Sequence, residues 1–190
     1  MKEILLPEIN SPAIAEYAQR SPEGVRFDDL SIEQSIELLK AGEVGGVIVG
    51  ADHTSADVIR AGIKLLGTVD GLVSSFFIMK KEGHDPIFFA DCAVNPDPDE
   101  EKLCKIAEQT AESVRKLGYS ASVAFLSFST DGSAGHTPQA QKVRSATRLF
   151  QERNPGVEAI GEVQFDAAWD DRIYEKKTGQ IMIEKPKILS

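Results

Sequence analysis

Residues 88–98, FFADCAVNPDP, are the stretch that decides the fold, because a short apolar run stops abruptly in a loop of small and turn-forming residues. A second stretch at residues 126–136, LSFSTDGSAGH, repeats this pattern. Apolar runs of this length that end in such loops are typical of buried strands. In parallel α/β sheets, ligands bind at the carboxyl ends of the strands. The two loops therefore predict an anion-sized pocket at one edge of a sheet.

Strand and helix patterns alternate along most of the chain. Strands are expected at residues 45–50, 71–79, 86–91, 122–127 and 157–165, with a short strand or extended arm at 2–6 and a last strand or tail at 180–184. Helices are expected at residues 12–20, 31–40, 56–66, 97–117, 138–153 and 167–177. This alternation predicts an α/β fold with a mainly parallel sheet and helices on both faces.

Two details refine this prediction. The polar turn KKEGHD joins the strands at 71–79 and 86–91, which favours an antiparallel hairpin at the edge of the sheet. The segment 67–70 is the best place for a domain boundary. We therefore expect a reduced N-terminal lobe at residues 1–67 and a core α/β lobe at 68–190 that carries both loops, with a single compact unit as the alternative.

The composition excludes several classes of protein. The 190-residue chain has a net charge of −9, which argues against nucleic acid as a partner. No apolar run approaches the roughly 20 residues that span a bilayer, and the N-terminal segment lacks a signal-peptide pattern. The cysteines, Cys92 and Cys104, are too few for a disulfide framework, and no Cys/His set has zinc spacing. We expect a cytoplasmic protein without a metal site and without membrane partners.

The hydrogen-bonding residues of the second loop are candidates for binding an anion. Ser129, Thr130 and Ser133 supply hydroxyl groups, and Gly132 lets the backbone approach a ligand closely. Hydroxyls and successive backbone amides form concave sites that bind phosphate groups. The alternative is a structural strand-to-helix loop with serine caps. For Asn95 in the first loop, a structural role as a turn former before a proline is the expected one when it is taken alone.

The segment HTSADVIR, residues 53–60, follows a glycine-flanked strand and enters a helix. Arg60 is a candidate to bind a phosphate with two hydrogen bonds. Asp57 in this segment and Asp166 in QFDAA are candidate carboxylates. For all three side chains, a solvated surface position is the alternative. The sequence contains no dinucleotide-binding, Walker or G-x-S-x-G motif.

Five segments occur in a fixed order: GADHTSADVIRAGIKLLG, LVSSFFIM, FFADCAVNPDP, AFLSFSTDGSAGH and GEVQFDAAW. In this order they resemble the phosphate acetyltransferase and phosphate butyryltransferase family, over residues 48–177. The resemblance implies two α/β lobes of the three-layer, isopropylmalate-dehydrogenase-like kind with a cleft between them. It also implies transfer of an acyl group between coenzyme A and inorganic phosphate, no metal in the transfer site, and a homodimer.

The resemblance also implies roles for particular residues. Arg60 matches an arginine that is implicated in binding coenzyme A or phosphate. Asn95 and Asp91 match a loop at the same cleft. The residues that match the loop lining the acyl phosphate pocket are Ser127, Ser129, Thr130, Gly132 and Ser133.

The chain departs from the family pattern in three places. The family's chains are longer, position 131 is usually lysine but here is Asp131, and the segment TGQIMIEKPKILS stands where the family continues toward its proposed catalytic serine, arginine and aspartate. Without that aspartate, the catalytic base would be Asp166 or Asp57.

Two hypotheses follow. The first is an acyltransferase that uses acyl phosphate, phosphate and coenzyme A, with coenzyme A as co-substrate and no tightly bound cofactor. The alternative is a non-catalytic or split-enzyme module that binds coenzyme A or acyl phosphate and needs a partner chain for turnover.

Overall fold

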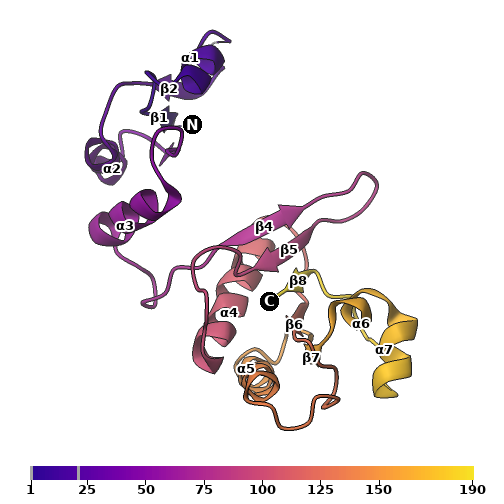
Figure 1. Ribbon diagram of the computed structural model, residues 1–190. Helices are drawn as coiled ribbons and strands as arrows, with labels where there is room; N and C mark the ends of the chain where they lie inside the picture. The colour runs from indigo at the N-terminus through magenta and orange to yellow at the C-terminus, as the bar shows by residue number, and fades with distance from the viewer. Residues whose placement is uncertain (1, 21) are drawn as a thin grey trace. The chain divides into compact units, whose positions relative to one another are not determined.

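The computed structural model describes residues 2–20 and 22–190, and the chain forms two compact units, Met1–Gly71 and Leu72–Ser190 (Figure 1). The sequence prediction placed this division after residue 67. Each unit contains its own sheet, so each is described by itself below. No helix in the described parts of the chain combines the length and the apolar character needed to cross a bilayer.

Unit 1 is a small α/β unit with a fully parallel three-stranded sheet in the order β2-β1-β3. Strand β2 is missing from the sequence prediction, and β3 is shorter than expected. Ser31 and Gln34 form a capping box at the start of α2, because each side chain bonds the other residue's backbone amide. The elements are β1 (Ile4–Leu6), α1 (Pro12–Ala18), β2 (Val25–Phe27), α2 (Ile32–Ala41), β3 (Gly46–Val47) and α3 (Ser55–Leu66).

Unit 2 holds a five-stranded sheet in the order β4-β5-β8-β6-β7. All of its neighbouring strands are parallel except β4 and β5, which form the predicted antiparallel hairpin. The elements are β4 (Phe76–Met79), β5 (Ile87–Ala90), α4 (Glu100–Lys116), β6 (Val123–Leu126), α5 (Pro138–Arg153), β7 (Ala159–Val163), α6 (Phe165–Trp169), α7 (Asp171–Thr178) and β8 (Ile188–Leu189).

Side chains of this sheet alternate between two apolar layers, as the two-residue period of a strand requires. Phe88, Phe125 and Ile188 pack with α4 and α5 on one face. Ala124 and Leu189 pack with α6 and α7 on the other face. Figure 1 shows the two pairs of helices on opposite sides of the strands. The predicted α/β class, with a mainly parallel sheet covered by helices on both faces, is therefore confirmed.

The last third of the chain differs from the sequence prediction in two ways. The single helix expected at residues 167–177 is two helices, because Asp170 is extended between them and its carboxylate caps the amides of Arg172 and Ile173. The strand or tail expected at 180–184 contains no strand. The last strand is instead β8, which lies in the middle of the sheet between β5 and β6.

The parallel strands of unit 2 bring their following loops to one edge of the sheet. The predicted loops at residues 88–98 and 126–136 follow β5 and β6, and residues 164–166 follow β7. This edge is where a parallel sheet binds ligands.

Candidate active site

The loop after β6 is built around a buried carboxylate, that of Glu162 on β7. The Ser129 hydroxyl donates to its Oε1 at 2.8 Å, and the Gly132 amide donates to the same oxygen at 3.0 Å. The Arg144 guanidinium lies 3.2 Å from Oε2 and 3.3 Å from Oε1. Glu162 is 3% exposed and Ser129 is fully buried. An internal anion therefore occupies the nest of amides and hydroxyls that the sequence predicts.

A slip in strand pairing gives Glu162 this position. Phe125 pairs with Gly161, but the next β6 residue, Leu126, pairs with Val163, so that Glu162 is skipped. An extra residue of this kind redirects a side chain, and such irregularities are common next to active sites. As a result the Glu162 carboxylate reaches the loop instead of either apolar layer.

The other hydroxyls of this loop hold its shape. Ser133 Oγ lies 3.1 Å from Ser129 Oγ and accepts from the Thr130 amide at 3.1 Å. Thr130 is buried and its hydroxyl bonds Gln164, across on the loop after β7. Ser127 Oγ accepts from the Ser129 amide at 3.3 Å. Of the predicted residues, Ser133 is exposed, and Ser127 and Gly132 are partly exposed.

The loop after β5 is organised by Asp91 in the same way. Its carboxylate accepts from the amides of Ala93, Val94 and Asn95 at 3.0 to 3.2 Å, and from the side chains of Ser75 and Asn95. Partial burial raises the pKa of Asp91, but these hydrogen bonds outweigh it and lower the pKa to about 2. Asp91 is therefore ionised at neutral pH, and a cavity lined by residues 91–96 lies beside it.

A third internal carboxylate, that of Glu8, organises unit 1. Glu8 follows β1 and accepts from the amides of Gly50, Ala51 and Asp52 at 2.8 to 3.0 Å and from His53 Nδ1 at 2.6 Å. Burial raises the pKa of Glu8, but the hydrogen bonds from His53 and the three amides lower it to about 2. Glu8 lies at the carboxyl end of β1, the central strand of the order β2-β1-β3. There the connections to the neighbouring strands diverge and leave a crevice, which is the usual binding position in an open parallel sheet.

The lowered pKa values of Glu8 and Asp91 predict a loss of stability in acid. A carboxylate whose folded pKa lies below its unfolded value stabilises the fold above the unfolded pKa and stops doing so as the pH falls through the folded pKa. The free energy of unfolding should therefore fall between about pH 5 and pH 2, by roughly 2 kcal/mol for each group. Urea titrations at a series of pH values measure this, and Glu8→Gln and Asp91→Asn should each flatten the dependence. A wild-type free energy that is constant over this range would contradict the prediction.

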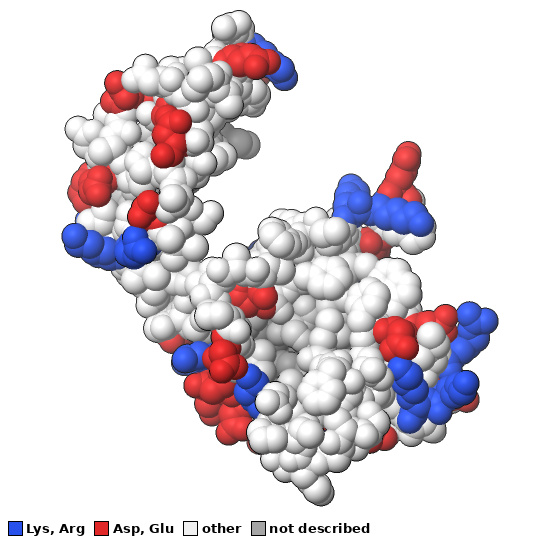
Figure 2. Space-filling model, viewed as in Figure 1, with Lys and Arg blue, Asp and Glu red and all other residues white. Residues whose placement is uncertain are grey.

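Arg60 and Asp57 lie together on α3 in unit 1. Asp57 accepts from the Thr54 hydroxyl at 2.6 Å and from Arg60 at 2.9 Å, and the Thr54 bond, followed by the Arg60 charge, lowers its pKa. The Arg60 side chain is 75% exposed. A cavity of about 580 Å³ lies beside α2 and α3, and Figure 2 shows basic side chains gathered over α3. The lining residues include Arg60, Lys64, His53, Ser31 and Ile63.

Asp166 lies on α6, at the carboxyl edge of unit 2. Both of its carboxylate oxygens accept from Lys177 Nζ at 2.8 Å, and this bond lowers the pKa of Asp166. A base acts best when its pKa is close to the working pH. The ionised but weakly basic carboxylates of Asp57 and Asp166 are therefore poor bases.

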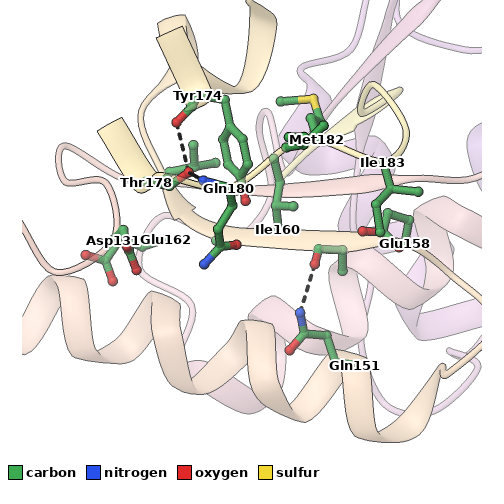
Figure 3. A pocket seen from close by; sticks show the side chains of 14 residues that line it. Asp131, Gln151, Glu158, Ile160, Glu162, Tyr174, Thr178, Gln180, Met182 and Ile183 are labelled. Atoms are coloured by element: carbon green, nitrogen blue, oxygen red, sulfur yellow. Dashed lines mark hydrogen bonds between the residues drawn. The ribbon is translucent and has the colours of Figure 1, made fainter. Parts of the chain in front are cut away.

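A cavity of about 280 Å³ lies beside β7 (Figure 3). Asp131, Glu158 and Glu162 are among the residues that line it. Tyr174 lines it too, and burial followed by the charges of Asp131 and Glu158 raises the pKa of its hydroxyl. Glu162 is paired with Arg144, but Asp131 and Glu158 still give this cavity an acidic lining, which disfavours an anion.

The family of the chain follows from comparison with known proteins. A sequence model of the phosphate acetyl/butaryl transferase family matches residues 22–185. The chain belongs to this family. The phosphate acetyltransferase of Thermoanaerobacterium thermosaccharolyticum is 43% identical over 148 residues, which are 74% of this chain and 45% of that enzyme. The chain spans less than half the length of the curated phosphate acetyltransferases that it matches.

Solved structures of phosphotransacylases share the fold. A phosphotransacetylase from Streptococcus pyogenes is 32% identical with a TM-score of 0.74, and the match covers 95% of this chain and 54% of that one. A branched-chain phosphotransacylase from Enterococcus faecalis V583 has a TM-score of 0.81 at 15% identity, over 100% of this chain and 78% of that one. The second likeness concerns the fold alone.

Asp91 was named from the sequence, but the other two carboxylates that hold the loops were missed. Glu8 and Glu162 were not among the predicted site residues, and neither was Arg144 or His53. Each of these side chains bonds a segment at least 18 positions away, which no local pattern reveals. The sequence signal that could have suggested these loop-holding side chains is an isolated glutamate next to a glycine-rich or serine-rich loop. Among the described residues, no group of three or more His, Cys, Asp or Glu side chains is arranged to hold a metal ion.

Proposed function

We propose that the chain transfers a short acyl group between an acyl phosphate and coenzyme A, releasing or consuming inorganic phosphate. Membership of the family supports this reaction. The observation that carries the proposal for this chain is the set of loops at the carboxyl ends of strands, each fixed by the internal carboxylate of Glu8, Asp91 or Glu162. Loops fixed in this way present their remaining polar groups in defined positions, which catalysis by electrostatic stabilisation requires. Coenzyme A is a co-substrate in this proposal, and no resident cofactor is needed.

The loops of unit 2 would bind the acyl phosphate. Ser127 and Ser133 offer partly or fully exposed hydroxyl groups after β6. The Gly132 amide donates to Glu162, and the Asn95 side-chain amide donates to Val73 and Asp91, so these two residues hold the loops in shape. Ser129 and Thr130 are buried and bonded to Glu162 and Gln164, so their contribution is to hold the loop in shape. Among the residues that resemble the family's pocket loop, the exposed ones would contact the substrate, and the buried ones would hold the loop in position.

Unit 1 contains its own candidate for binding phosphate groups. Arg60 is exposed beside a cavity, and a guanidinium binds a phosphate with two hydrogen bonds. Its present partner, Asp57, is exposed too, and such surface pairs are weak enough to exchange for a substrate. We assign to Arg60 the phosphate groups of coenzyme A or of the acyl phosphate.

Arg60→Ala tests this assignment against a matched variant. We expect the rate of thioester formation from acetyl phosphate and coenzyme A to fall roughly 10- to 100-fold, the value of a charged hydrogen bond. Arg20→Ala is the control, because the Arg20 side chain is similarly exposed (70%) and also pairs with an acid four positions before it, Glu16. Equal rates for the two variants would contradict the role of Arg60.

A homodimer in the cytoplasm is part of the same proposal. Strand β4 forms an edge of the unit 2 sheet and exposes Phe77, Ile78 and Met79. An exposed apolar edge strand is a template for pairing with a second chain. This edge supports association between two copies.

A further inference from the structure

His53 and Glu8 form a hydrogen-bonded pair that the roles assigned so far do not use. Glu8 Oε1 lies 2.6 Å from His53 Nδ1, and the Glu8 side chain is only 5% exposed. Three backbone amides also donate to the Glu8 carboxylate, two to Oε2 and one to Oε1. The carboxylate can only accept a hydrogen bond, so the proton lies on Nδ1 and the lone pair of the neutral ring lies on Nε2.

The His53 ring lines a cavity. The imidazole is 39% exposed and lines the cavity of about 580 Å³ that also contains Arg60. In the described part of the chain, no hydrogen bond to Nε2 is formed. Enzymes activate hydroxyl and thiol nucleophiles with a histidine that a carboxylate orients through one ring nitrogen while the other nitrogen stays open.

We propose that Nε2 of His53 is the base that removes the thiol proton of coenzyme A, with Glu8 as its positioning residue. This inference rests on the proposed acyl transfer and adds the base for it. The thiol proton passes to Nε2, and the sulfur forms a bond to the acyl carbon. The bond between that carbon and the phosphate oxygen breaks, and phosphate leaves with the electron pair. The proton on Nε2 then passes to water, which restores the neutral ring.

The alternative bases are less suitable. Asp57 and Asp166 are each paired with a cation, Arg60 or Lys177, and those pairs favour the ionised and weakly basic carboxylate. The imidazole has an ordinary pKa of 6.5, which its hydrogen bond to the Glu8 carboxylate raises. A base with a pKa near neutrality removes a thiol proton efficiently at physiological pH.

The charged groups around His53 come from several elements. Glu8 follows β1, Asp52 precedes the ring in the same loop, and Asp57 lies on α3; all three raise the pKa of His53. Glu33 on α2 lies on the same cavity. The cations of that cavity are Arg60 and Lys64 on α3. Activity should therefore rise with pH through a His53 pKa above 6.5, and Glu8→Gln should move this rise to lower pH.

The test compares His53→Gln with His84→Gln in the full chain. His84 is exposed in the turn between β4 and β5, where its Nδ1 lies 3.0 Å from the carbonyl oxygen of Glu82, and so it is the matched histidine. Thioester formation from acetyl phosphate and coenzyme A is measured as kcat and KM from pH 5 to pH 9. We expect His53→Gln to lower kcat by about 10² to 10⁴-fold with little change in KM, and to lose the acidic limb of the profile.

Two further measurements separate a base from a structural side chain. Free imidazole should restore part of the rate to His53→Gly, which a merely structural loss would not allow. Circular dichroism should show the variants folded. If wild-type protein turns over and His53→Gln matches His84→Gln, the role of His53 is overturned while the proposed function stands. If folded wild-type protein forms no thioester, the proposed function itself fails.

Discussion

Glu162→Ala is expected to lower the free energy of unfolding of unit 2 by about 3–5 kcal/mol and to abolish acyl transfer. The substitution leaves the Arg144 guanidinium without its buried counter-charge and takes the acceptor away from the Ser129 hydroxyl and the Gly132 amide. Donors left without partners in the interior carry the full cost of desolvation. The loop after β6 would then lose the shape that presents Ser133 and Ser127.

Two companion variants separate charge from shape. Glu162→Gln keeps the acceptor for Ser129 but loses the charge opposite Arg144, so we expect an intermediate loss of stability. Glu158→Gln is the control, because Glu158 is partly exposed near the start of the same strand. Urea unfolding followed by the fluorescence of Trp169, the single tryptophan of the chain, measures the stability of unit 2. Equal stability of Glu162→Ala and Glu158→Gln would contradict the assigned role.

Gly161→Ala is expected to destabilise unit 2 by roughly 3 kcal/mol or more. A Cβ atom at this position would lie 2.7 Å from the Cβ of Phe125 and 2.6 Å from Thr147 Oγ1, and its φ of +154° is one that other residues rarely adopt. Phe125 is fully buried on β6, so it has little room to move. The strands would have to separate at the point where Glu162 leaves the regular pairing.

Gly156→Ala is the matched control for this substitution. Gly156 precedes β7, its φ is not positive, and no atom lies within 4 Å of the Cβ it would gain. We expect its unfolding midpoint to match that of the wild type within experimental error. A Gly161→Ala protein that is as stable as Gly156→Ala would show that the close approach of β6 and β7 is not required.

The elements that the sequence predicts well are those with local determinants. Helix α4 has Asp99 as its N-cap, acids in its first turn and Arg115 and Lys116 in its last turn, and all of these lie within the helix or next to it. The hairpin of β4 and β5 has a polar turn between two apolar runs. Hydrophobic period and capping residues act over a few positions, and a single sequence displays them.

The elements that the sequence does not predict depend on contacts between distant segments. Strand β8 is only two residues long, and its position between β5 and β6 comes from pairing with segments more than 60 positions away. The break between α6 and α7 lies at Asp170, because its carboxylate caps the start of α7 and so competes with continuation of α6. Neither a two-residue strand nor such a competition can be recognised from a local pattern.

The candidate site divides in the same way. Serine, threonine and glycine residues mark the loop after β6, so the loop itself could be predicted. The anion that fills it is Glu162, which lies 33 positions beyond Ser129 and reaches it only through the slip in strand pairing. Likewise, HTSADVIR marks a loop and a helix start, but the partner of His53 is Glu8 at the end of another strand. A side chain that organises a site from a distant strand or helix can be identified only when the fold is known.

Thioester formation by the purified chain is the measurement that tests the central claim most directly. The folded protein is mixed with acetyl phosphate and coenzyme A, and acetyl-coenzyme A and phosphate are quantified over time. We predict that both products form in equal amounts, at a rate proportional to protein concentration, and only when both substrates are present. Folded protein that forms no thioester above the protein-free control would contradict the assignment of acyl transfer to this chain.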